Sequence, residues 1–187
     1  KKQVEYRFDD IISHVTSSDA FSETERRNML AYVHAMRTFQ DFYDLDSMGM
    51  HIKRAYDYYS GSVPFSPPFY SWALYAPSMY ALVRRFGESA TSQSEKFVRY
   101  HNMYTEITQH GRFFEQVYLT EQRYCVGDMY DARKRALAIA DEAVQPEDIP
   151  PRLIALTVAG SCSLMVGTYD EYKECVSRIA EVTRRYP

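Results

Sequence analysis

Histidine, cysteine and carboxylate side chains are the groups in this sequence that could bind a metal ion or carry out acid–base chemistry. The histidines lie at positions 14, 34, 51, 101 and 110, and none forms a His-x-x-x-His or Glu-x-x-His pair, the spacings that bring two ligands onto one helix face. The cysteines at 125, 162 and 175 also lack a metal-ligand spacing and predict reduced, buried thiols. We therefore expect no metal site and no cofactor in this chain.

Nucleophilic catalysis has no better candidate. No serine, threonine or cysteine lies in a Gly-x-Ser-x-Gly elbow. The small residues of 160–163 (Gly-Ser-Cys-Ser) fall inside an apolar helical pattern, where they indicate close contact between helices. Asp44 and Asp46 are two positions apart and would not face each other on a helix, so a solvated turn is the better interpretation. We expect the chain not to be an enzyme.

Composition and charge restrict the remaining classes of fold and of function. Of 187 residues, 45% are hydrophobic and 25% charged, which excludes a disordered or low-complexity chain. The net charge of −3 offers no attraction for phosphates, so we expect this segment to bind no nucleic acid. The longest apolar stretch, 153–166, is too short to span a bilayer, and no signal peptide opens the chain. These features predict a cytoplasmic protein without a membrane partner. Because the sequence lacks a starting Met and stops abruptly, we also expect a piece of a larger protein.

A repeat organises the chain. Gly87, Gly127 and Gly167 are spaced by 40 residues, and a further step back reaches Ser47 in the turn-like stretch 45–49. Apolar residues recur with helical spacing on either side of the later glycines, which predicts helices over 113–126, 130–144, 153–166 and 169–182.

Helix boundaries agree with that repeat. The stretches 22–25 and 92–95 read as capping boxes that each open a helix, and Pro150-Pro151 suits a first helical turn. Breaks fall at 61–68 and 145–151, and no stretch has the alternation of a strand. We predict one all-α domain over 1–187, a right-handed α-solenoid of helical hairpins at 22–60, 68–110, 112–145 and 150–187.

The hairpins resemble tetratricopeptide repeats. Gly127-Asp128 and Gly167 with Tyr169 match the turn of that repeat, and Gly160 matches its first-helix glycine. Thr120 replaces this glycine in the preceding hairpin, Tyr172 stands where alanine is expected, and the period is 40 instead of 34. These departures imply a looser superhelix.

A longer series of residues is similar to the central helical-repeat region of LuxR-type transcriptional regulators of the maltose-activator kind. It runs from Trp72 to Glu88, continues through 103–106, and reaches Glu121, Tyr124 and Gly127-Asp128, with Ala132, Ala136 and Leu137 beyond. The resemblance implies a parent with an N-terminal ATP-binding switch domain and a C-terminal helix-turn-helix that binds DNA. This sequence contains no P-loop, and its net charge of −3 does not suit a DNA-binding helix-turn-helix, so both activities would belong to other parts of the parent.

Stacked hairpins would line the concave wall of a solenoid with one face of each first helix. In the register set by Gly127 and Gly167, that face is expected to contain His34, Arg37, Asp41, Arg84, Glu121, Tyr124, Thr157 and Ser161. Such polar and aromatic groups would suit a small inducer or a peptide partner, although a solvated groove without a ligand fits them equally.

Two functions follow from these patterns. The preferred one is a non-catalytic sensor and interaction segment of a LuxR-type regulator. The alternative is a free-standing tetratricopeptide-like scaffold that binds partner peptides. The sequence leaves the inducer, the target genes and the oligomeric state open.

Overall fold

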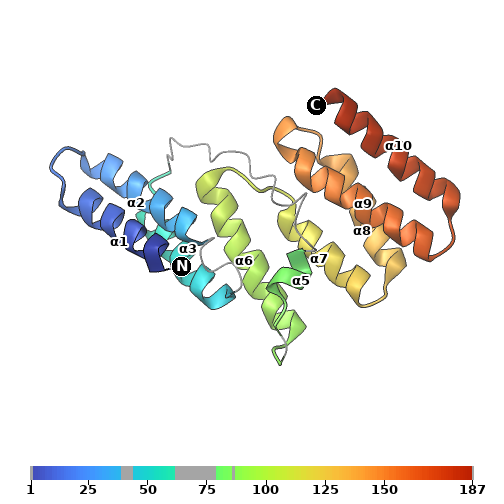
Figure 1. Cartoon of the computed structure of the whole chain (residues 1–187), viewed down its shortest axis with the longest axis horizontal. Helices are drawn as coiled ribbons and strands as arrows, with labels where there is room; N and C mark the ends of the chain where they lie inside the picture. Colours follow the sequence, from blue (N-terminus) through green and yellow to red (C-terminus); the bar gives the residue numbers. More distant parts are fainter. Residues whose placement is uncertain (1, 39–43, 62–78, 86, 187) are drawn as a thin grey trace. The chain divides into compact units, whose positions relative to one another are not determined.

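The computed structural model describes residues 2–38, 44–61, 79–85 and 87–186, and every regular element within these ranges is a helix (Figure 1). The all-α prediction is confirmed for these residues. In the same ranges no helix is long and apolar enough to cross a membrane. The α-helices, with the 3-10 helix η2 (Pro146–Asp148), are α1 (Lys2–Ser17), α2 (Glu23–Arg37), α3 (Leu45–Tyr58), α5 (Met79–Val83), α6 (Ala90–Thr108), α7 (Phe114–Cys125), α8 (Met129–Glu142), α9 (Ile149–Met165) and α10 (Tyr169–Arg185).

The helices belong to two compact units. Unit 1 contains α1, α2, α3 and α6, and unit 2 contains α5 and α7 to α10. The predicted hairpin 68–110 therefore has its described helices in different units, α5 in unit 2 and α6 in unit 1. The later predicted hairpins, 112–145 and 150–187, both lie in unit 2.

Unit 1 begins with a helix that the sequence patterns did not identify. α1 packs against α2, with Val15 buried between neighbours and Asp9 paired with Arg37 at 2.5 Å. α2 opens as predicted with a capping box: the Ser22 backbone N–H donates to Glu25 Oε2 (2.9 Å), and the Glu25 N–H donates to Ser22 Oγ (3.3 Å).

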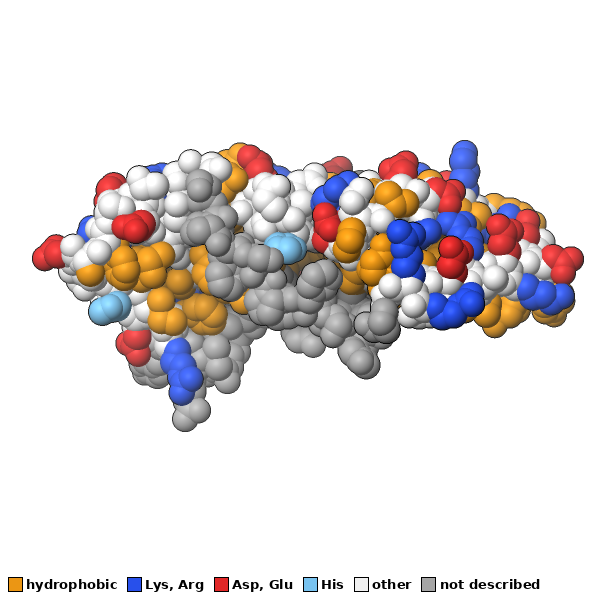
Figure 2. All heavy atoms as spheres, turned by 90° about the horizontal axis from the view of Figure 1, so that it is seen from above, with side chains coloured by type: hydrophobic (Ala, Val, Ile, Leu, Met, Phe, Trp, Pro, Cys, Tyr) orange, Lys and Arg blue, Asp and Glu red, His pale blue; other side chains and the backbone are white. Residues whose placement is uncertain are grey.

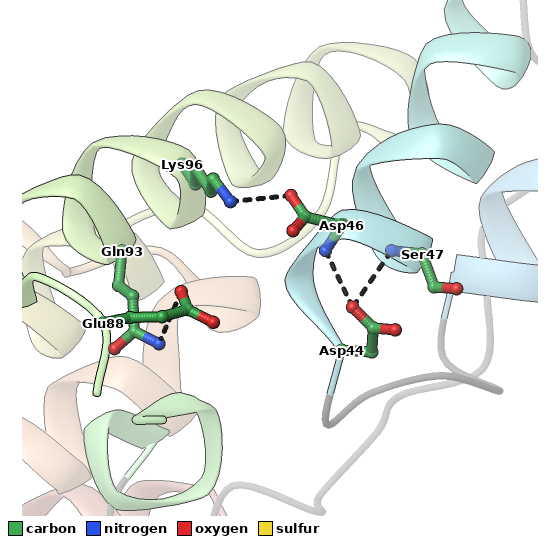
Figure 3. Close-up of polar contacts among 6 residues, drawn as sticks. All are labelled: Asp44, Asp46, Ser47, Glu88, Gln93 and Lys96. Atoms are coloured by element: carbon green, nitrogen blue, oxygen red, sulfur yellow. Dashed lines mark hydrogen bonds and ion pairs between the residues drawn. The ribbon is translucent and has the colours of Figure 1, made fainter. Parts of the chain in front are cut away.

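The expected turn around Ser47 is wrong, because this stretch is the first part of α3. Asp44 is the N-cap, and its Oδ1 accepts the backbone N–H groups of Asp46 (3.0 Å) and Ser47 (3.3 Å), as Figure 3 shows. Because the carboxylate satisfies these N–H groups, the helix starts at residue 45, and the 40-residue register of turns does not extend to Ser47. Asp44 is thus a capping residue instead of part of a solvated turn.

The second predicted capping box, 92–95, is also wrong as a helix start. α6 begins earlier, at Ala90, with Ser89 as N-cap accepting from the Ser92 N–H (3.4 Å). Gln93 lies inside the helix and is almost fully buried. Its amide nitrogen donates to Glu88 (3.1 Å, Figure 3) and its oxygen accepts the Arg85 N–H (3.2 Å). The Gln93 side chain therefore holds the preceding turn against α6.

α3 and α6 run parallel in unit 1. Lys96 donates to Asp46 at 2.7 Å near the start of both helices, and Tyr56 donates to Glu106 at 3.1 Å near their ends. Both contacts join residues 50 positions apart. Between the helices of this unit lies an apolar core of Ala35, Ile52, Ala55, Tyr104 and Ile107.

Unit 2 consists mainly of two hairpins with the same kind of turn. Gly127, between α7 and α8, and Gly167, between α9 and α10, have φ of +88° and +81°. Gly87 has the same conformation, with φ +88°. This left-handed region is strained for other residues and is typical of a helix C-terminus, so the predicted role of these glycines as turn residues is confirmed. Each helix of the two hairpins lies within a few residues of its predicted range.

The core of unit 2 joins α7, α8, α9 and α10, and small residues line it where α8 meets α9. Ala136, Ala140, Ala155 and Ala159 are all buried within it. Gly160 continues this pattern toward α10, because a Cβ at this position would lie 3.4 Å from Cys175 and 3.5 Å from the Tyr172 ring. The predicted close contact at Gly160 is confirmed. Tyr172, the residue that departs from the tetratricopeptide pattern, fills the space that this glycine leaves.

Two ion pairs join α8 to α10. Arg133 pairs with Glu171 near the start of both helices, and Arg178 pairs with Asp141 (2.5 Å) further along both. In both helices the second ion pair lies further toward the C-terminus than the first, so α8 and α10 run parallel. Pro150 and Pro151 lie in the first turn of α9 as predicted.

Candidate functional site

The predicted groove residues fall into both units. His34 and Arg37 belong to unit 1, whereas Arg84, Glu121, Tyr124, Thr157 and Ser161 belong to unit 2. Asp41 lies outside the described residues. The structure therefore brings together two sets, which are considered separately.

His34 is part of a buried aromatic stack. It is 5% exposed, and its ring stacks on Tyr58 (centroids 5.8 Å apart) and His51 (6.1 Å), both from α3. Its Nδ1 is buried without a hydrogen-bond partner among the described residues. This position provides packing between α2 and α3 and leaves little surface for a ligand.

Burial is the main reason that the pKa of His34 is lowered to about 4. His51, Arg54 and Arg37 lower it further, and Asp9 acts weakly in the opposite direction. The imidazole is therefore neutral at physiological pH. Arg37 itself is mostly covered and pairs with Asp9 of α1, so its charge already has a partner inside unit 1.

Glu121 is also buried, at 6% exposure, and it fastens α5 to α7. Its Oε2 accepts the backbone N–H of Tyr80 at 2.9 Å, and the Tyr80 ring meets the Tyr118 ring edge-on with centroids 5.5 Å apart. Arg84 follows α5 and donates its backbone N–H to the Tyr80 carbonyl at 2.9 Å. Glu121 is thus engaged by α5, and a charge-assisted hydrogen bond of this kind serves the fold.

Arg84, Tyr124, Thr157 and Ser161 are the predicted residues that remain accessible in unit 2, and Arg84 is half-buried. Thr157 is exposed, and Tyr124 and Ser161 are half-buried. The two hydroxyls donate within α9, Thr157 to the Leu153 carbonyl (2.8 Å) and Ser161 to the Thr157 carbonyl (2.9 Å). Each hydroxyl oxygen can still accept a hydrogen bond from a ligand. Since α7 and α9 are in contact, Tyr124, Thr157 and Ser161 lie on neighbouring first helices.

None of the three thiols is activated. Burial raises the pKa of Cys162 to about 11 and also raises the pKa of Cys175. Cys125 is exposed, so the prediction of a buried thiol is wrong there, because it lies at the last residue of α7 beside the turn. Its pKa is raised as well, by desolvation and by Glu121. These thiols are not suited to nucleophilic chemistry.

Metal ligands do not converge within the described ranges: no group there of three or more His, Cys, Asp or Glu side chains could hold an ion. Charges of both signs are interspersed with hydrophobic side chains on the face drawn in Figure 2. That face therefore lacks the single-sign field that steers a polyanion. No protein-family model, curated protein or solved structure matches this chain.

One group of surface residues escaped the sequence analysis. Val126 and Tyr130 beside the first turn of unit 2, and Met165 and Tyr169 beside the second, are all more than half exposed. Periodicity could not identify them, since a hydrophobic residue near a helix end looks the same in sequence whether or not a neighbouring helix covers it. The repeated tyrosines were the available signal, as both follow a turn glycine by two or three residues.

Proposed function

We propose that this chain is a non-catalytic sensor and protein-interaction segment built from tetratricopeptide-like hairpins, of the kind found in LuxR-type transcriptional regulators. One observation carries the proposal. Hairpins α7–α8 and α9–α10 turn on left-handed glycines 40 residues apart, and their second helices run parallel. Hairpins repeated in one direction are the building principle of a solenoid, which supports the proposed right-handed superhelix.

The polar residues Tyr124, Thr157 and Ser161 are the proposed binding surface. It lies on α7 and α9, the first helices of both hairpins, and its hydroxyls have free acceptor capacity. A small polar inducer or a peptide backbone could donate hydrogen bonds to it. Binding would bias a regulator only if the ligand has different affinities for two arrangements of the hairpins.

A thermal-shift screen tests this proposal. The chain is heated with a panel of neutral oligosaccharides, amino acids and short peptides, and each hit is followed by calorimetry. We expect at least one compound to raise the Tm, and Ser161→Arg to abolish that shift. The matched control, Lys134→Ala on the exposed face of α8, should retain it. If no compound stabilises the chain, a passive spacer is the better account.

A free-standing scaffold is the second candidate, and the exposed Tyr130 and Tyr169 favour it. Tyrosine is enriched among the residues that dominate protein interfaces. The gene sequence around this segment separates the two candidates. A P-loop upstream and a helix-turn-helix downstream support the regulator, whereas the absence of both supports the scaffold.

A further inference from the structure

The outer face of α10 has residues of the same kind, in the same register, as the face of α8 that contacts the hairpin α9–α10. The turn glycines set the comparison, since Gly127 and Gly167 are 40 residues apart. In this register Ala136, Ala140 and Ala143 of α8 correspond to Val176, Ala180 and Thr183 of α10. The three alanines are 0% exposed and pack against the α9 side of the core. On α10 the equivalent residues are all exposed, Val176 at 45%.

The charges repeat with the same register. Arg133 and Asp141 of α8, which pair with Glu171 and Arg178 of the following hairpin, correspond to Lys173 and Glu181 of α10. The sign of the charge is the same at both positions. Among the described residues Lys173 pairs with the fully exposed Asp170 at i,i+3 (3.2 Å), and Glu181 is exposed. α10 thus presents the small-residue stripe and both flanking charges of a hairpin-receiving face.

We propose that this face of α10 docks a helical hairpin of the α9–α10 kind, supplied by a partner protein. The first helix of the partner carries small residues four apart, as Ala155 and Ala159 do, and lies over Val176 and Ala180. Its second helix carries a carboxylate opposite Lys173 and, seven residues later, a cation opposite Glu181. Glu171 and Arg178 of α10 have this spacing where they pair with Arg133 and Asp141 of α8.

Apolar burial and charge have separate roles in this contact. Removing Val176 and the α10 stripe from water supplies the attraction, because burial of apolar surface is the main driving force of association. The exposed charge pairs add little affinity and fix the register and direction of the hairpin. The inference depends on the repeat register and is independent of the ligand-binding face on α7 and α9.

A register-matched extension of the full chain supplies the probe. A second copy of residues 147–186 is placed directly after Tyr186, so that each copied residue follows its original by 40 positions. In a repeat array each added interface stabilises its neighbours, so we expect a rise of several degrees in Tm and slower amide exchange in α10. No rise in Tm together with unchanged exchange in α10 would overturn the proposal.

Charge variants test the register within that extended chain. Lys173→Glu should reduce the gain in Tm, because it places two carboxylates opposite each other, and adding Glu→Lys at the copied equivalent of Glu171 should restore the gain. Glu174→Lys, one position further around α10, is the matched control and should keep the gain. An equal effect of Lys173→Glu and Glu174→Lys would contradict the docking geometry. Lys173→Glu in the chain without the extension should leave the Tm unchanged.

Sedimentation of the unextended chain tests the choice of occupant. We expect a species whose mass does not depend on concentration. A dimer that Lys173→Glu dissociates would mean that a second copy covers this face, which would overturn the assignment to a partner hairpin. Failure of the ligand screen leaves every one of these outcomes unchanged, so the two proposals can fail separately.

Discussion

Gly49 of α3 lies directly against the ring of Tyr100 of α6. A Cβ at position 49 would be 2.6 Å from the Tyr100 hydroxyl oxygen and closer still to two ring carbons. The Tyr100 ring is held in turn beneath Lys53, whose Nζ is 5.5 Å from the ring centroid. The absence of a side chain at Gly49 thus lets two parallel helices approach each other.

We predict that Gly49→Ala destabilises the protein, although alanine is the better helix former. Forcing a methyl group into a packed contact costs about 1–3 kcal/mol, and the gain in helix propensity offsets about 1 kcal/mol of it. Chemical denaturation measures the net loss. In a Tyr100→Ala background the clash is gone, so the same substitution should become stabilising by up to about 1 kcal/mol. Equal effects in both backgrounds would contradict the contact.

Gly127 should tolerate alanine and valine almost equally badly. Its φ of +88° costs other residues roughly 1–2 kcal/mol, whereas no atom lies within 4 Å of a Cβ built there. We expect Gly127→Ala and Gly127→Val to lower the free energy of unfolding by similar amounts, and Gly127→Asn by less, since asparagine accepts this conformation. A far larger loss with valine than with alanine would indicate close packing at this turn.

These two glycines illustrate what the sequence could predict. The 40-residue spacing and the helical patterns on either side identified Gly127 as a turn residue, so the turns of unit 2 and four helix ranges were predictable from sequence. Gly49 looked like another turn residue, because sequence does not show that Tyr100, 51 positions later, packs against it. The burial of Gln93 was missed for a similar reason, whereas the N-cap Asp44 accepts from the nearby N–H groups of Asp46 and Ser47, a local pattern that the sequence does carry.

The candidate site was less predictable than the fold. Register alone placed His34 and Glu121 on a groove, but register cannot tell whether a neighbouring helix covers a polar group. α3 covers His34, and α5 binds Glu121 through the Tyr80 N–H. In unit 2 the predicted residues Arg84, Tyr124, Thr157 and Ser161 all keep some exposure, and the last three lie on the first helices of the two hairpins.

Stability should depend on pH through His34. Its pKa in the folded state is lowered to about 4, so between that value and its ordinary value of about 6.5 the unfolded chain binds more protons. The contribution of the neutral ring is therefore present above pH 6.5 and is lost as the pH falls toward 4. The loss is at most about 3 kcal/mol. His34→Phe should flatten the curve of unfolding free energy against pH in this window, and His14→Phe, on the exposed part of α1, should not.

Asp148 should be a destabilising residue at neutral pH. Its carboxyl is 1% exposed, and the nearest cation, Arg112 Nη1, lies 4.0 Å from Oδ2. Burial raises the pKa of this group, with Arg112 acting in the opposite direction. Relative to the unfolded chain, the folded state therefore favours the protonated form of Asp148. The free energy of unfolding then falls as the pH rises from the unfolded-state pKa through the folded-state pKa. Asp148→Asn should therefore raise the free energy of unfolding at pH 7, by an amount on the order of 1 kcal/mol.

The neighbouring Glu147 provides the control for that prediction. It is exposed, so Glu147→Gln should change stability far less than Asp148→Asn. A clear loss of stability in Asp148→Asn at pH 7 would mean that the pair with Arg112 outweighs the cost of burying the charge.

The two hairpins of unit 2 repeat in one register, with α8 and α10 parallel. Spin labels at exposed positions 134 and 142 of α8 and 170 and 181 of α10 test this arrangement, by pulsed electron resonance in a Cys125→Ser background. Parallel helices with the observed ion pairs predict that the 134–170 and 142–181 distances are both shorter than the 134–181 and 142–170 distances. The reverse order would contradict the repeat and, with it, the docking face proposed on α10.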